Sequence, residues 1–201
     1  MKKYQGAFMH FKKIILSSLL LGSSLYAKNS LGLNINNNDL EIRAAIDLNG
    51  LADYSNGTTY LLDLDYLHVG DPSANMTMVG FSGQNTLQGL QGFTLAFGMK
   101  SILASDFAAL SFTGKAIYTL PISSDIPKTD LIFNAAYAPA VLSFRDGDQY
   151  TEFRVETDME IIPNVHMFAG YRNIELGYEV NHISFDAEFS ESFYGGMRLT
   201  F

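Results

Sequence analysis

The stretch YTEFRVETDMEII, residues 150–162, decides the fold of this chain, because charged and uncharged side chains alternate along it. The charged positions are Glu152, Arg154, Glu156, Asp158 and Glu160. The positions between them hold Phe153, Val155, Thr157, Met159 and Ile161. A helix would spread the five charges around its circumference, whereas a β-strand places all five on one side. The stretch therefore predicts a strand with one charged face and one mostly apolar face.

The same alternation returns along most of the chain after residue 30. Turn-forming pairs such as Asn49-Gly50 and Asp146-Gly147 separate the alternating runs at the spacing of an antiparallel meander. The predicted strands lie near residues 31–36, 40–49, 59–69, 75–83, 91–102, 107–120, 130–139, 149–162, 165–178 and 192–201. In the fourth strand, Met76, Met78 and Phe81 do not settle which face is apolar. We expect an all-β fold, a closed antiparallel transmembrane β-barrel of about ten strands, with eight as the alternative.

Residues 1–27 have the pattern of a signal peptide. Lys12 and Lys13 precede an apolar run from Ile14 to Leu21, and small residues follow as far as Ala27, after which we expect cleavage. Translation starts at Met1 or Met9. The run is shorter than the roughly 20 apolar residues of a spanning helix, which argues against an uncleaved anchor. The sequence thus predicts an exported protein with one domain over residues 28–201.

Composition excludes several classes of function. Removal of residues 1–27 takes away four lysines and leaves 9 basic against 21 acidic residues, a formal net charge of −12. Such a chain would be repelled by nucleic acid. The sequence contains no cysteine, which rules out a disulfide scaffold and a thiolate metal site.

Three features favour lipid over solvent outside the predicted barrel. The chain carries an export signal, its predicted strands are long enough to cross a bilayer at a tilt, and its last strand ends in an aromatic residue. The residues of that last strand on one face, which we interpret as the signal for the outer-membrane assembly machinery, are Phe193, Met197, Leu199 and Phe201. Tyr66, Tyr118, Tyr137 and Tyr171 are expected in the interfacial girdles. The alternative is a soluble periplasmic β-barrel or sandwich, with the apolar face inside.

An even number of strands places both termini on the periplasmic side. The external loops are then 36–39, 70–75, 103–106, 140–148 and 179–191, and the periplasmic turns are 50–58, 84–90, 121–129 and 163–164. Residues 183–189 alternate and are expected to extend a hairpin above the membrane. The external segments carry Asp39, Asp71, Asp106, Asp146, Asp148, Glu179, Asp186, Glu188 and Glu191 against Arg145 alone. Lipopolysaccharide phosphates would be repelled unless Ca²⁺ or Mg²⁺ bridged them, so divalent-bridged lipid contact is a hypothesis against plain solvation of the loops.

The polar faces of the strands predict a charged lumen. Its expected members are Glu41, Arg43, Asp47, Asp63, Asp65, Lys100, Lys115, Glu152, Arg154, Glu156, Asp158, Glu160, Arg172 and Arg198. Charges withdrawn from bulk water require partners, and both signs are present, so we expect a structural ion-pair network that largely occludes the lumen. The alternative is a narrow channel for small solutes in which the excess of carboxylates favours cations.

Catalytic and cofactor motifs are weak. His68, His166 and His182 are the histidines after the signal peptide, and none has a nucleophile in a recognisable motif. Gly80-Phe81-Ser82-Gly83 lacks the second glycine of a nucleophile elbow. No metal-ligand spacing and no phosphate-binding loop is present. We therefore predict no catalytic residues, no metal site and no cofactor, with an outer-leaflet lipid-modifying enzyme as a minor alternative.

The second half of the sequence resembles a known family. The motifs are Gly98-Met99-Lys100, Tyr137-Ala138-Pro139, Tyr150-Thr151-Glu152 and Gly170-Tyr171-Arg172, together with the aromatic last strand. On these motifs the chain from about residue 91 onward resembles the YfaZ family of outer-membrane proteins. The resemblance implies a ten-stranded barrel in the bacterial outer membrane and supplies no catalytic residues. We expect a monomer with a structural role in the cell envelope.

Overall fold

The computed structural model describes residues 29–51, 57–122, 126–180 and 183–201. The predicted signal peptide, residues 1–27, lies outside this part of the chain. The described strands are β1 (Ser30–Ile35), β2 (Asp39–Asp47), β3 (Thr59–Gly70), β4 (Ser73–Thr86), β5 (Phe93–Leu103), β6 (Phe107–Thr119), β7 (Thr129–Ala138), β8 (Ser143–Arg145), β9 (Gly147–Ile162), β10 (Val165–Val180) and β11 (Ile183–Thr200). Two short 3₁₀ helices, η1 (Asn49–Leu51) and η2 (Ala140–Leu142), accompany them. Over these described ranges, no helix is both long and apolar enough to span a membrane.

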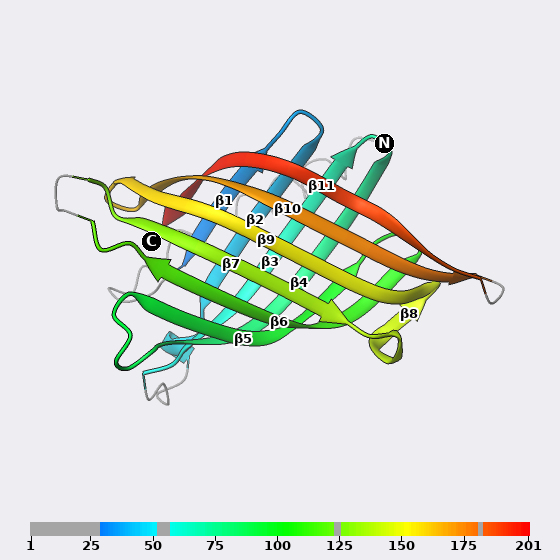
Figure 1. Ribbon diagram of the computed structural model, residues 1–201, viewed down its shortest axis with the longest axis horizontal. Helices are drawn as coiled ribbons and strands as arrows, with labels where there is room; N and C mark the ends of the chain where they lie inside the picture. The colour runs from blue at the N-terminus through cyan, green and yellow to red at the C-terminus, as the bar shows by residue number, and fades with distance from the viewer. Residues whose placement is uncertain (1–28, 52–56, 123–125, 181–182) are drawn as a thin grey trace, which may run out of the picture.

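The strands form one closed antiparallel barrel (Figure 1). Each long strand pairs with its neighbours in sequence, β5 pairs with β6, and β1 pairs with β11 with Leu31 opposite Leu199. The three-residue β8 pairs with the first residues of β6, Phe107–Ala109, whereas β7 pairs with β6 from Phe112 onward. It therefore continues the position of β7 and adds no barrel strand. The predicted ten-stranded antiparallel barrel is confirmed.

The two ends of the barrel differ. Asn29 and Phe201 exchange backbone hydrogen bonds of 3.2 and 3.0 Å at one end, which we call the terminal end. At the other, far end, β10 and β11 project as a hairpin (Figure 1). Strand β9 follows β10 as far as Tyr178, whereas β11 runs far past β1. The predicted extension of residues 183–189 is confirmed, since Phe185 pairs with Tyr178.

Several predicted boundaries were wrong. Residues 179–191, predicted as a loop, lie mostly in β10 and β11, and β11 starts at Ile183 instead of residue 192. Predicted loop 140–148 contains η2, β8 and the start of β9. Strand β4 begins two residues earlier and ends three residues later than predicted. The ends of β4 carry small and polar residues without alternation, so the sequence pattern lost them. Residues 183–189 do alternate, but they were assigned to a hairpin outside the counted strands.

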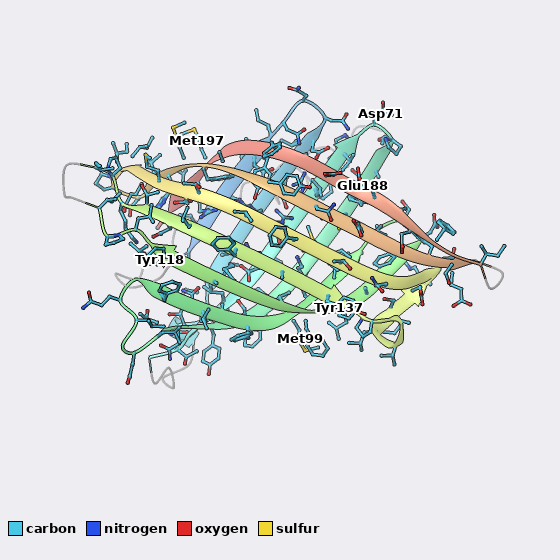
Figure 2. The ribbon with its side chains drawn as sticks, in the orientation of Figure 1. Asp71, Met99, Tyr118, Tyr137, Glu188 and Met197 are labelled. Atoms are coloured by element: carbon cyan, nitrogen blue, oxygen red, sulfur yellow. The ribbon has the colours of Figure 1, made fainter. Side chains whose placement is uncertain are left out.

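Apolar side chains cover the outside of the wall. Phe193 is 79% exposed and Phe97 is 68% exposed, whereas Glu41 and Arg172 are fully buried inside. Figure 2 shows the side chains of Met99 and Met197 pointing away from the barrel. The wall is thus apolar outside and charged inside, the reverse of a soluble barrel.

The sequence predicted a lumen that is polar throughout. The structure shows that one part of it is apolar. At the far end it is filled by a cluster that we call the apolar plug. Its buried members are Leu67, Val69, Met76, Met78, Ile102, Phe107, Ala109, Ala136, Ala138, Tyr150, Ile174 and Leu176. The ring of Phe107 packs at 6.2 Å from Tyr150 and edge-on at 5.7 Å from Tyr178. The facing of β4 is also resolved, because Met76 and Met78 point inward.

Candidate functional site: a charged lumen and its vestibule

Charged side chains from opposite walls meet in the middle of the barrel. Glu41 of β2 stands at the centre, with no exposed surface. It accepts hydrogen bonds from Arg154 Nη1 and Nη2 at 2.8 and 2.7 Å and from Arg172 Nη1 at 2.8 Å. The side-chain amide of Asn34 donates a fourth bond at 2.7 Å. Because Arg154 lies on β9, this contact spans the lumen and joins residues 113 positions apart.

The strand period places a second carboxylate beside the first. Glu152 and Arg154 point to the same side of β9, and Arg154 Nε donates to Glu152. Lys100 of β5 also pairs with Glu152, whose Oε2 accepts a 2.8 Å bond from the Tyr150 hydroxyl. Glu152 therefore links the network to β5 and to the apolar plug.

Two further carboxylates of β9 continue the row toward the terminal end. Glu156 pairs with Arg43 at 2.6 Å and with Arg198, and it accepts a 3.0 Å bond from the Tyr194 hydroxyl. Asp158 Oδ1 lies 2.6 Å from His166 Nδ1. Asp158 Oδ2 lies 2.8 Å from Arg198 Nη1, an ion-pair contact that lacks hydrogen-bond geometry.

Aromatic rings support the guanidinium groups of this row. The Arg43 and Arg198 guanidinium carbons lie 4.9 and 5.0 Å from the centre of the Phe168 ring. Tyr194 lies beneath Arg172 at 5.4 Å. These cation–π contacts hold the cations in place where water is scarce.

The network also closes a gap between strands at the far end. Strand β1 ends at Ile35, which pairs with Gly195 of β11. The part of β11 before Gly195 therefore has no partner among the described strands on the side of β1. Asp39 bridges the gap, pairing with Arg172 Nη2 at 2.6 Å and accepting bonds of 2.9 and 3.1 Å from the hydroxyls of Ser190 and Ser192. Next to this bridge, at the far end of the barrel, lies a groove of about 600 Å³ between the β1–β2 turn and β11.

The placement of Asp39 corrects the sequence analysis, which assigned it to an exposed external loop. It is the first residue of β2 and is 7% exposed.

The charges of the network balance, and we refer to its members together as the lumen network. They are the cations Arg43, Lys100, Arg154, Arg172 and Arg198, the carboxylates Asp39, Glu41, Glu152, Glu156 and Asp158, and His166.

Other residues predicted for the network lie outside it. Asp63, Asp65 and Lys115 face the lumen but take part in none of the ion pairs within the described ranges, and Asp63 receives only a long 3.4 Å bond from Ser82. Glu160 accepts a 3.1 Å bond from the backbone of Asn164 in the turn. The sequence prediction missed Asn34, Asp39, His166, Ser190 and Tyr194, although each has the phase of its strand's inward positions.

Asp63, Asp65 and Lys115 line a cavity, which we call the vestibule. It has a volume of about 350 Å³. Ser30 and Thr200 line it near the terminal end, and Glu152 and Arg154 of the lumen network line its inner part. The apolar plug lies beyond the network, so the vestibule is a blind recess.

Within the described ranges, the His166 ring pairs with Asp158 and the His68 ring with Asn75, so neither of these contacts involves a serine. His68 Nδ1 lies 2.8 Å from Asn75 Oδ1 on the outer surface, whereas Ser82 points into the lumen. His182 lies outside the described residues. Among the residues that are described, no group of three or more His, Asp or Glu side chains is arranged to hold a metal ion.

Carboxylates gather on the outer face of the β10–β11 hairpin. Glu175 pairs across the strands with Glu188, which is labelled in Figure 2, and Glu191 lies nearby. A hydrogen bond with Glu191 raises the pKa of Glu188, and desolvation and the charges of Glu191 and Glu175 add to this shift. Glu188 and Glu191, which were predicted in an external loop, therefore lie on a strand of this hairpin.

Together these features define a class of protein, a closed ten-stranded β-barrel with an apolar exterior and a lumen blocked by ion pairs and a plug. Comparison with family models, curated proteins and solved structures gave no match.

Proposed function

We propose that this chain is an outer-membrane β-barrel of the YfaZ type with an occluded lumen and a structural role in the cell envelope. In this proposal a cleaved signal peptide exports it, and the outer-membrane assembly machinery recognises its last strand. The observation that carries the proposal is the two-layer closure of the lumen. The Arg154–Glu41 contact crosses the middle, and the apolar plug fills the far end.

The outer surface supports a lipid environment. Large apolar side chains project outward around the wall, among them Phe97, Phe133 and Phe153, each at least 44% exposed. Monomeric soluble proteins rarely expose contiguous apolar patches of such extent, whereas lipid chains would cover them. Tyr66 and Tyr137 lie toward the far end of this band, where interfacial tyrosines belong.

The lumen supports a structural role more than transport. A permeating ion would have to displace buried pairs whose members have at most 19% exposed side chains. Separating a buried pair leaves an uncompensated charge, at a cost of about 3–5 kcal/mol. The second candidate is the narrow cation-preferring channel, and the vestibule would be the half of its pathway that is open, although its charged lining holds as many cations as carboxylates.

Fractionation and conductance measurements test the proposal. An outer-membrane barrel should stay in the membrane fraction after carbonate or urea extraction and should change its SDS-gel mobility on heating. Refolded protein in planar bilayers should show little steady conductance. A soluble periplasmic monomer would refute the membrane assignment, and large cation-selective steps would favour the channel.

A further inference from the structure

We propose that the edge of β11 beside the far-end groove binds an extended peptide in which lysine or arginine alternates with apolar residues. We call residues 183–194 of β11, on the side of β1, the free edge. The peptide adds to the sheet as a further strand and continues the line of β1, which ends at Ile35. This inference goes beyond the structural role, because it makes the barrel a docking platform for an extended segment of another protein.

The first argument is the unpaired backbone of the free edge. Strand β11 pairs with β10 from Leu199 back to Ile183. On its other side, within the described chain, β1 pairs only with residues 195–200. Backbone N–H and C=O groups of an antiparallel strand point alternately to its two sides, so about half of those in residues 183–194 face away from β10. Such a row of groups is a template for the backbone of another extended chain.

The second argument is the room beside this edge. The free edge extends about 40 Å along the strand, at roughly 3.3 Å per residue. The groove of about 600 Å³ opens at its start, between the β1–β2 turn and β11. Beyond the groove, β10 and β11 project from the barrel as a hairpin (Figure 1). A strand of eight residues, about 26 Å long, fits within the length of the free edge.

The third argument is the different chemistry of the two faces beside the edge. On the face toward the apolar plug, Phe185 stacks on Tyr178 at 5.5 Å and is 50% exposed, and Phe189 packs against the plug. The opposite face carries the exposed carboxylates of Asp186 and Glu188. Side chains of adjacent strands interact when they share a face. The bound strand therefore needs apolar residues on one face and cations on the other, which is an alternating sequence.

The fourth argument is the unbalanced charge of the groove. Asp71 and Glu188, both labelled in Figure 2, line it together with Glu191, and its lining includes no lysine or arginine. A hydrogen bond with Glu191 raises the pKa of Glu188, and a nearby cation would offset this crowding of carboxylates. The acidic face also opposes pairing of two copies edge to edge, because it brings carboxylates of both chains together. The charges thus favour a basic peptide over a second copy of this chain.

Amide hydrogen exchange of the full refolded chain in detergent micelles, read by mass spectrometry, tests the inference. The probe is a synthetic peptide of about eight residues that alternates lysine and valine and has blocked ends. We expect saturable protection of fragments from the free edge and none of fragments from β6. Two control peptides carry glutamate in place of lysine, or proline in place of two valines. Each should bind roughly tenfold more weakly, because the first reverses the charge and the second removes backbone donors.

The double variant Asp186→Asn with Glu188→Gln should weaken binding of the lysine peptide by roughly tenfold. Asp106→Asn is the matched control, since Asp106 is an exposed carboxylate in the β5–β6 turn, and it should bind as the original chain does. Each variant is first checked for the heat-dependent gel shift, and Glu188→Gln alone replaces the double variant if that variant does not fold.

Three results would overturn the inference. The first is no protection of the free edge at peptide concentrations up to about 1 mM. The second is equal protection by the proline or the glutamate peptide, which would show adsorption without strand pairing or without charge recognition. The third is a dimer whose free edge is protected before peptide is added, which would show that a second copy occupies it. Extraction and conductance play no part in this readout, so its failure would leave the structural role intact.

Discussion

Replacement of Arg154 by Met should destabilise the barrel strongly, because it removes the cation that spans the lumen. Arg154 donates two bonds to Glu41 and one to Glu152. Neither carboxylate is left without a partner. Glu41 keeps Arg172 and Asn34, and Glu152 keeps Lys100 and Tyr150. The loss should therefore lie near the lower limit for breaking a buried pair, about 3 kcal/mol.

Equilibrium urea unfolding of refolded protein in lipid vesicles, followed by far-ultraviolet circular dichroism, measures this loss. Lys115→Met is the matched control, because it removes a lumen cation that has no ion-pair partner among the described residues, and it should cost less than about 1 kcal/mol. The double variant Arg154→Met with Glu41→Gln should lose less than the two single variants together, by about 1–3 kcal/mol. Equal effects of Arg154→Met and Lys115→Met would refute a structural network.

Three further predictions concern the plug, the last strand and the hairpin. Phe107→Ala should lower the free energy of unfolding by about 3–5 kcal/mol, as urea unfolding would show, whereas the exposed Phe144→Ala should have little effect. Deletion of Phe201 should slow folding into proteoliposomes that contain the assembly machinery, and Phe201→Tyr should not; equal rates would contradict its assembly role. The pKa of Glu188 is raised above its ordinary 4.5, so its protonation stabilises the hairpin at low pH, and this stability is lost as pH rises through the raised pKa. Glu188→Gln should therefore reduce the pH dependence of the hairpin's amide protection factors, that is, of exchange rates divided by the intrinsic rates at each pH, and an unchanged dependence would contradict the assignment.

Alternation in the sequence was enough to predict the fold class and the orientation of most side chains. In β9 it placed Glu152, Arg154, Glu156 and Asp158 inward, where each is at most 3% exposed. It could not predict which charges meet. The Arg154–Glu41 contact depends on the curvature that brings β9 opposite β2, and local periodicity contains no information about that curvature.

The apolar plug was missed although its signal lay in the sequence. Leu67 and Val69 share the phase of Asp63 and Asp65, so the inward face of β3 changes from charged to apolar along one strand. We had expected each strand to have one polar face and one apolar face along its whole length. A strand whose inward face turns apolar near one end breaks this rule. Such a strand predicts that the lumen is filled at that end.

The plug and the lumen network depend on each other physically. Ion pairs in a water-filled lumen of this width would be screened and would contribute little, as exposed pairs do. The plug excludes water from the far side, which lowers the local dielectric and strengthens every contact of Glu41 and Glu152. Tyr150 joins the two layers, since its ring packs in the plug and its hydroxyl donates to Glu152. Water admitted by a cavity at Phe107 should therefore weaken the ion pairs as well, so Phe107→Ala and Arg154→Met should be non-additive in the free energy of unfolding. Strict additivity of the two would show that the layers act independently.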